Sequence, residues 1–205
     1  MQSSAVTTFG LMRHAETRWN QESKIQGQAD TPLAPEGIQQ ARHWARLLRL
    51  HPWDRIISSD LSRAAQTAGL INEALQVPLG TTARLREQDW GNWTGQTPRQ
   101  IKAQAPGFYV AQVKSGWRFC PPGGEDRNSV WQRGRRALEK AALRRPGASI
   151  LVVTHEGLIK CLIYRLLSRR FLPTEPSILR PHHLHRLSFG PDGLQIEKIN
   201  ALPLG

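Results

Sequence analysis

Cysteine, long apolar runs and acidic side chains are all scarce in this chain of 205 residues. Its two cysteines, Cys120 and Cys161, give no disulfide framework, so we expect reduced thiols and a cytoplasmic protein. No stretch approaches the roughly 18 consecutive apolar residues that a membrane-spanning helix needs. The first residues lack a charged segment followed by a long apolar one, so we expect neither a signal peptide nor a membrane partner.

Acidic residues number 16 against 28 lysines and arginines, which gives a formal net charge of +12. A basic surface attracts anions, among them nucleic acids and phosphorylated metabolites. The basic residues are scattered, and the densest runs, 133–136 and 144–145, fall where an amphipathic helix and its end are expected. We therefore expect a solvated basic face, keep an attraction for phosphorylated metabolites as the alternative, and rank nucleic-acid binding last.

The order of apolar patterns predicts one α/β domain over residues 1–205, since no repeat, linker or low-complexity tract interrupts it. Strand-like and helix-like segments alternate, which is typical of a three-layer α/β/α fold with a mostly parallel central sheet. Strands are expected at 7–12, 55–59, 81–85 and 148–154, helices at 38–48, 64–75, 130–145 and 156–167, and a hairpin at 185–200. The pattern breaks at 96–124, which we expect to form a small cap over one end of the sheet.

Polar side chains fall where the expected strands end. Arg13 and His14 close the first strand, His155 follows the densest one, and 58–60 leads into the helix that carries Arg63. In open α/β sheets, ligands bind in the crevice beyond the carboxyl ends of the strands. Two histidines and two arginines are therefore expected to meet there.

These residue types suit phosphoryl transfer. Its transition state spreads negative charge over three oxygens, and arginine matches phosphate oxygens with a planar, permanently charged fork. A neutral imidazole is a capable nucleophile when its other nitrogen is hydrogen-bonded, and a second, protonated histidine would stabilise the transferring group. A carboxylic acid would then protonate the leaving alkoxide. None of these steps calls for a metal.

Four sequence blocks resemble the signatures of the histidine phosphatase (phosphoglycerate mutase-like) superfamily. Residues 13–20, Arg-His-Ala-Glu-Thr-Arg-Trp-Asn, resemble its R-H-G-E-T/S-x-W-N motif, and Gln26-Gly27 follows at the usual spacing. Residues 58–68 resemble the block with a phosphate-binding arginine, 85–95 the block with a proton-donating glutamate, and 152–157 the block with a second histidine. The resemblance covers residues 7 to 160 and implies a phosphoglycerate mutase-like fold.

The resemblance also implies roles for individual side chains. His14 would be the phosphorylated nucleophile, Glu87 the general acid and then the base, and His155 the second catalytic histidine. Substrate binding would fall to Arg13, Arg63, Asn20, Thr17, Gln26 and Gly27. The implied activity is hydrolysis of a small phosphorylated metabolite without metal or cofactor, as in α-ribazole phosphatase and broad-specificity phosphomonoesterases. The oligomeric state stays open.

Two positions depart from the family pattern. Ala15 adds one methyl group where glycine usually stands beside the nucleophile, and we expect it to be tolerated. Glu156 stands where a second glycine often follows the catalytic histidine. Its carboxylate either points to solvent or enters the pocket, where it would repel an anionic substrate or pair with a basic group.

Competing functions are a phosphoglycerate mutase-type phosphotransferase and a non-catalytic phosphate-binding protein. The run 87–91 lacks the Arg, His and Tyr of the glycolytic mutases, and a pure binder needs no proton donor such as Glu87. A zinc motif at His155-Glu156 fails because position 159 is Ile, and Cys161 in an apolar helix favours packing over catalysis.

The histidine and tryptophan residues give two further signals. The histidines at 182, 183 and 185 suggest either a metal site or, as we expect, a loop leading into an edge strand. Trp90, Trp93 and Trp117 are candidates for lining a substrate pocket, whereas Trp44 and Trp131 are expected in the core or half-buried.

Overall fold

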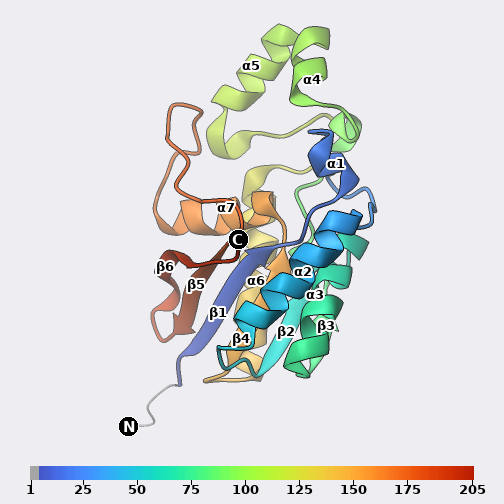
Figure 1. Ribbon diagram of the computed structural model, residues 1–205. Helices are drawn as coiled ribbons and strands as arrows, with labels where there is room; N and C mark the ends of the chain where they lie inside the picture. Colours follow the sequence, from blue (N-terminus) through green and yellow to red (C-terminus); the bar gives the residue numbers. More distant parts are fainter. Residues whose placement is uncertain (1–4) are drawn as a thin grey trace.

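A computed structural model describes residues 5–205, and its centre is a six-stranded sheet of order β3-β2-β4-β1-β5-β6 (Figure 1). The strands are β1 (Thr7–Arg13), β2 (Arg55–Ser58), β3 (Leu79–Thr81), β4 (Ser149–Thr154), β5 (His183–Gly190) and β6 (Gly193–Pro203). The first four strands are mutually parallel, and β5 and β6 add an antiparallel hairpin beside β1. The expected mostly parallel sheet is confirmed.

Helices cover both faces of this sheet, as a three-layer fold requires. On one face, α2 (Pro35–Leu48) and α3 (Ser62–Leu75) pack on Leu151 and Val153 of β4. On the other face, α6 (Arg127–Arg144) and α7 (Glu156–Leu166) pack on Ile150 and Val152 of the same strand. Because successive side chains of a strand point to opposite faces, a continuous apolar run in β4 serves two cores at once.

Two details of the expected sheet were wrong. The segment 81–85 is not a strand: β3 ends at Thr81, the Thr82 hydroxyl accepts a hydrogen bond from the Arg84 amide (3.3 Å), and Ala83–Leu85 forms a 3₁₀ turn. A hydroxyl that caps a helical turn offers the backbone an alternative to strand pairing. The strand that follows the histidine-rich segment is also internal rather than at the edge, since β5 pairs with both β1 and β6.

The segment expected to form a cap contains two short helices, α4 (Pro98–Gln104) and α5 (Pro106–Lys114). Figure 1 shows them beyond the sheet, at the end where the short helix α1 (Arg18–Gln21) follows β1. Ile101 of α4 packs with Trp93 and Phe119 in a small aromatic cluster of its own. These helices therefore lie over the carboxyl ends of the parallel strands.

None of the helices within residues 5–205 is both long and apolar enough to span a lipid bilayer.

Candidate active site

The two histidines predicted at strand ends lie next to each other. β1 and β4 are neighbours with Arg13 paired to Thr154, and the His14 amide continues the ladder by donating to the Thr154 carbonyl (2.9 Å). His155 directly follows β4, and the centres of the two imidazole rings are 5.2 Å apart. Sheet register therefore brings together two residues that are distant in sequence.

Hydrogen bonds fix which nitrogen of His14 carries the proton. Its Nδ1 lies 2.7 Å from the Ala15 carbonyl oxygen, which can only accept, so Nδ1 holds the hydrogen. The Nε2 lone pair accepts from Nε of Arg63 over 3.2 Å. Burial, followed by the charges of Arg13 and Arg63, holds the pKa of His14 well below its usual value, so the ring is neutral at pH 7. This is the tautomer and charge state that a nucleophile at Nε2 needs.

Arg63 is fully buried at the start of α3, where backbone carbonyls hold its fork. Nη1 donates to the Ala29 carbonyl (2.8 Å) and Nη2 to the Gly27 carbonyl (2.7 Å), which leaves Nε directed at His14. Burial lowers its pKa to about 10, while nearby Glu87 and Asp30 act in the opposite direction. The guanidinium is therefore still charged at neutral pH and rigidly oriented beside the His14 nitrogen.

His155 is fully buried, and neither of its ring nitrogens has a hydrogen-bond partner within residues 5–205. Burial and the neighbouring His14 and Arg63 keep its pKa well below the usual value. The His155 ring is therefore neutral at pH 7. A buried imidazole without partners is costly unless another group satisfies it.

Glu87 is held at the beginning of α7. Its Oε1 accepts from the Gln88 amide (2.7 Å) and its Oε2 from the Gly157 amide (3.1 Å), two residues beyond His155. The Glu87 carbonyl accepts from Arg133 Nη2 (2.9 Å), which fixes the loop that carries this residue. A Cβ at Gly157 would collide with the Glu87 carboxylate, so a side chain there would displace this group.

Arg13 and Glu156 form an ion pair on the open side of the site. Arg13 Nη1 donates to Glu156 Oε2 at 2.9 Å, and Lys160 pairs with Oε1 of the same carboxylate. Burial raises the pKa of Glu156, but Arg13 and Lys160 outweigh this and lower it, so the carboxylate is ionised. Of the two alternatives for Glu156, the structure therefore shows the carboxylate at the pocket and paired with basic groups of the protein.

Three further predicted residues support the site through their own hydrogen bonds. The Thr17 hydroxyl and the Asn20 amide group form a capping box at α1, with Asn20 Oδ1 accepting from the Thr17 amide (3.0 Å). Gln26 Oε1 accepts from the Thr31 hydroxyl (2.6 Å). Of these, Asn20 lines the cavity beside His14, whereas Thr17 and Gln26 do not, and neither do Arg63, Glu87 and His155. Substrate binding by Thr17 and Gln26 stays a prediction.

Gly27 contributes its carbonyl rather than a side chain. Its φ of +50° lies in the left-handed region that favours glycine, and a Cβ there would press on Thr94 and Trp90. This conformation lets the carbonyl accept from Arg63, so Gly27 aims the arginine that faces His14.

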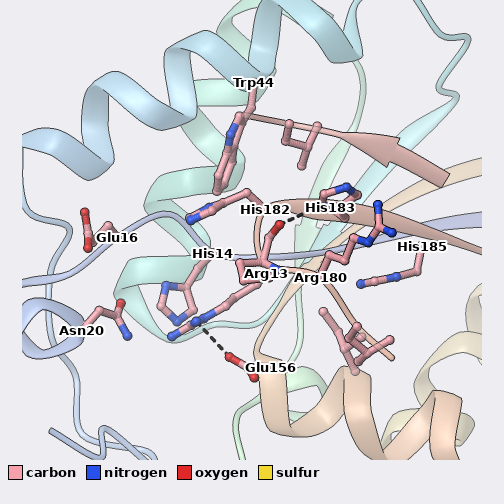
Figure 2. A pocket seen from close by; sticks show the side chains of 14 residues that line it. Arg13, His14, Glu16, Asn20, Trp44, Glu156, Arg180, His182, His183 and His185 are labelled. Atoms are coloured by element: carbon pink, nitrogen blue, oxygen red, sulfur yellow. Dashed lines mark hydrogen bonds and ion pairs between the residues drawn. The ribbon is translucent and has the colours of Figure 1, made fainter. Parts of the chain in front are cut away.

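A cavity of about 340 Å³ opens beside His14 (Figure 2). Its lining includes several residues to which the motifs assign no role, among them Trp44, Ile159, Leu179, Arg180, His182 and Leu204. Trp90, Trp93 and Trp117, which were candidates for a pocket, do not line this cavity; Trp44 of α2, expected in the core, does. The segment between α7 and β5 has no periodic pattern, so only the position of the histidines hinted at its role.

The part of the chain that the structure describes holds no group of three or more His, Cys, Asp or Glu side chains able to bind a metal ion. His182 and His183 lie instead on the cavity wall, with His182 Nδ1 3.1 Å from Gln40 Nε2 and His183 Nδ1 2.7 Å from the Pro181 carbonyl.

Comparison with known proteins assigns this geometry to a family. The model of the histidine phosphatase superfamily (branch 1) matches residues 9–202. The chain belongs to the histidine phosphatase superfamily. Adenosylcobalamin/alpha-ribazole phosphatase of Salmonella typhimurium is 33% identical over 158 residues, 77% of this chain and 78% of that protein. Glucosyl-3-phosphoglycerate phosphatase of Mycobacterium tuberculosis is 37% identical over 169 residues, 77% of this chain and 74% of that protein.

Solved structures agree with the family assignment. Bacillus stearothermophilus YhfR superposes with a TM-score of 0.87 and 26% identity, over 97% of this chain and 98% of that one. The phosphoglycerate mutase-like α/β fold expected from the sequence blocks is confirmed. The two relatives above are named as phosphatases, enzymes that hydrolyse phosphoric monoesters of small molecules, whereas a relative from Salmonella choleraesuis, 34% identical, is named a probable phosphoglycerate mutase.

Proposed function

We propose that this protein hydrolyses a small phosphomonoester in the cytoplasm through a phosphohistidine at His14 Nε2, without a metal or another cofactor. The observation that carries the proposal is the fixed tautomer of His14, whose Nδ1–H is tied to the Ala15 carbonyl while Nε2 faces Arg63. The superfamily match and the phosphatase names of the relatives support the same reaction class. The two free thiols, Cys120 and Cys161, support a reducing compartment.

In the first step, His14 Nε2 attacks phosphorus and the ester oxygen leaves. Arg13 and Arg63 stabilise the charge on the transferring oxygens, because both lie beside His14 and arginine forks match those oxygens. The unpaired ring nitrogens of His155 gain a partner when a phosphoryl oxygen reaches them. A phosphate dianion also favours the protonated form of this ring, which reverses the effect of the two arginines.

Glu87 is the proton donor in the first step and the proton acceptor in the second. Its carboxyl group, held by two backbone amides, donates a proton to the departing alkoxide. In the second step, water attacks the phosphohistidine, Glu87 removes the proton from that water, and phosphate leaves with Nε2 restored. Asn20 lines the approach to His14 and adds a contact to the substrate. Thr17, Gln26 and Gly27, the other predicted substrate-binding residues, lie in the segments that hold these groups.

Helices α4 and α5 form the cap. It lies beyond the sheet at the end that carries α1, where it can restrict access to the phosphoryl site (Figure 1). The relatives named above are called adenosylcobalamin/alpha-ribazole phosphatase and glucosyl-3-phosphoglycerate phosphatase, so a small phosphorylated metabolite fits this family.

The deciding experiment measures release of inorganic phosphate from a panel of phosphomonoesters in the presence of EDTA. We expect activity that survives the chelator and falls at least a thousandfold in His14→Ala, with the thermal unfolding curve retained. An acid-labile phosphoprotein should form in the wild type alone. Residual activity of His14→Ala above a tenth of wild type contradicts the proposal, and a phosphoryl transfer between acceptors without phosphate release indicates a mutase.

A further inference from the structure

The carboxylate of Glu156 borders the cavity beside His14. Glu156 is the first residue of α7, directly after His155, and its side chain is 45% exposed on the cavity wall. Figure 2 shows the carboxylate below Arg13, on the same side as the His14 ring. We propose that Glu156 is a specificity-determining residue, which makes the enzyme favour phosphomonoesters whose leaving group carries no negative charge. The inference rests on the proposed phosphatase activity and names the substrate class of that site.

Two cations fix the position of this carboxylate. Arg13 Nη1 donates to Oε2 at 2.9 Å, and Lys160, one helical turn along α7, pairs with Oε1. Because both oxygens have partners on the protein, Glu156 cannot rotate away from the cavity without breaking an ion pair. Arg13 keeps its remaining donors for the phosphoryl oxygens, and Glu156 partly compensates the charges of Arg13 and Lys160.

The other charges around the cavity do not favour an anionic leaving group near His14. Glu16 adds a second carboxylate to the lining. Burial lowers the pKa of His182, and that of His185 to about 4, so both rings are neutral at pH 7. Arg180 is exposed, and Figure 2 shows its side chain directed toward His183 and away from His14.

Apolar side chains supply the rest of the lining. Leu179 is half-buried and offers apolar surface for an uncharged ring or alkyl group, and the buried side chains of Trp44, Ile159 and Leu204 lie behind the wall. Pockets for small ligands combine such surface with a few polar groups that fix orientation. The carboxylates of Glu16 and Glu156 accept hydrogen bonds, so hydroxyl or amino groups on the leaving group are suitable partners.

The test compares kcat/KM for three esters of the same shape, phenyl phosphate, 4-carboxyphenyl phosphate and 4-(aminomethyl)phenyl phosphate. For the wild type we expect the carboxylate-bearing ester to be at least tenfold poorer than phenyl phosphate, a difference of about 1.4 kcal/mol. Glu156→Gln, which keeps the shape and removes the charge, should reduce this ratio about tenfold. Glu156→Gly provides a second variant, and circular dichroism checks that both fold.

Glu139→Gln is the matched control, because it makes the same change in net charge. Glu139 forms an ion pair with Arg135 one helical turn away on α6 and does not line the cavity. We expect it to keep the wild-type ratio. An unchanged ratio in both Glu156 variants, with phenyl phosphate still hydrolysed, overturns the inference and leaves the proposed function standing. No hydrolysis of any ester by the wild type overturns the proposed function, and the inference with it.

Discussion

Arg63 donates a hydrogen bond from Nε to Nε2 of His14 over 3.2 Å, the nitrogen that the proposed mechanism uses as nucleophile. Arg63 therefore lies beside the place where the phosphoryl group has to bind. Two carbonyls of the 26–30 loop hold its other nitrogens, so the guanidinium is placed before any substrate arrives. Such preorganisation is how enzymes stabilise charge that develops in a transition state.

Arg63→Lys should therefore lower kcat/KM about a hundredfold to a thousandfold, the usual cost of removing one preorganised donor. A lysine keeps the charge but cannot bind two carbonyls and face His14 at once. Steady-state hydrolysis of phenyl phosphate measures the loss. Arg86→Lys is the matched control: within the described residues, Arg86 binds Asp60 with two nitrogens (2.7 and 2.6 Å) and makes no hydrogen bond to His14, so activity should change less than about threefold. Equal losses in the two variants would contradict the role of Arg63.

Gly157→Ala should reduce kcat with little loss of stability. The added methyl group collides with the Glu87 carboxylate and displaces the proposed proton donor. Alanine is favoured over glycine in a helix by about 1 kcal/mol, which offsets the strain. Kinetics and thermal unfolding, measured together, separate the two effects.

Gly69→Ala serves as the control for that substitution. Gly69 lies in α3, and a Cβ there meets nothing within 4 Å. We expect a gain of about 0.5–1 kcal/mol in the free energy of unfolding and unchanged kcat. If Gly157→Ala behaves in the same way, the close approach to Glu87 has no catalytic consequence.

Acid should destabilise the fold below about pH 6.5. Burial lowers the pKa of His14 and His155 well below the usual value, and that of His185 to about 4. The unfolded chain binds protons at these residues near pH 6.5, before the native state does, so stability falls as the pH falls. Each such histidine contributes up to about 1.4 kcal/mol per pH unit.

Urea unfolding at pH 7.5 and pH 5.5 measures this dependence. The His14→Gln and His155→Gln variants should each show a smaller loss between the two values. A free energy of unfolding that stays constant over this range would mean that these rings titrate in the folded protein as they do in the unfolded chain.

Cys161 should be inert, which separates the thiol alternative from the histidine mechanism. Burial raises the pKa of its thiol to about 12, although Arg127 opposes this. The thiolate is the reactive form, so iodoacetamide should leave Cys161 unmodified in the folded protein at pH 8. Mass spectrometry of the labelled chain shows which cysteine reacts. Cys161→Ala should retain phosphatase activity, and its loss in a well-folded variant would reopen the alternative.

The sequence predicts the groups that lie at strand ends. His14 and His155 directly follow apolar strands, Arg63 lies in the helix that follows the next strand end, and the structure brings all three together. Glu87 comes from a motif alone, because its position depends on a backbone amide of Gly157. Local patterns thus suffice where a regular strand delivers the side chain.

The cavity was not predictable in the same way. Trp44 keeps helical spacing in α2 and is only 2% exposed, which is typical of a core residue, yet it faces the cavity. His182 lies in a segment without periodicity, and it contacts Gln40, which is 142 residues earlier in the sequence. Pairing of Glu156 with Arg13 likewise depends on the register of β1 and β4. Long-range geometry of this kind leaves no mark in a local pattern.

The placement of His14 and His155 on adjacent strands divides the protein into two complementary parts. A break in the loop between α4 and α5 would leave one fragment with His14, Arg63 and Glu87, and the other with His155 and Glu156. Neither fragment has a complete site, and β1 pairs with β4 only when the two associate. Hydrolysis of a chromogenic ester would therefore show that the two fragments have reassembled, and no fluorescent label would be needed.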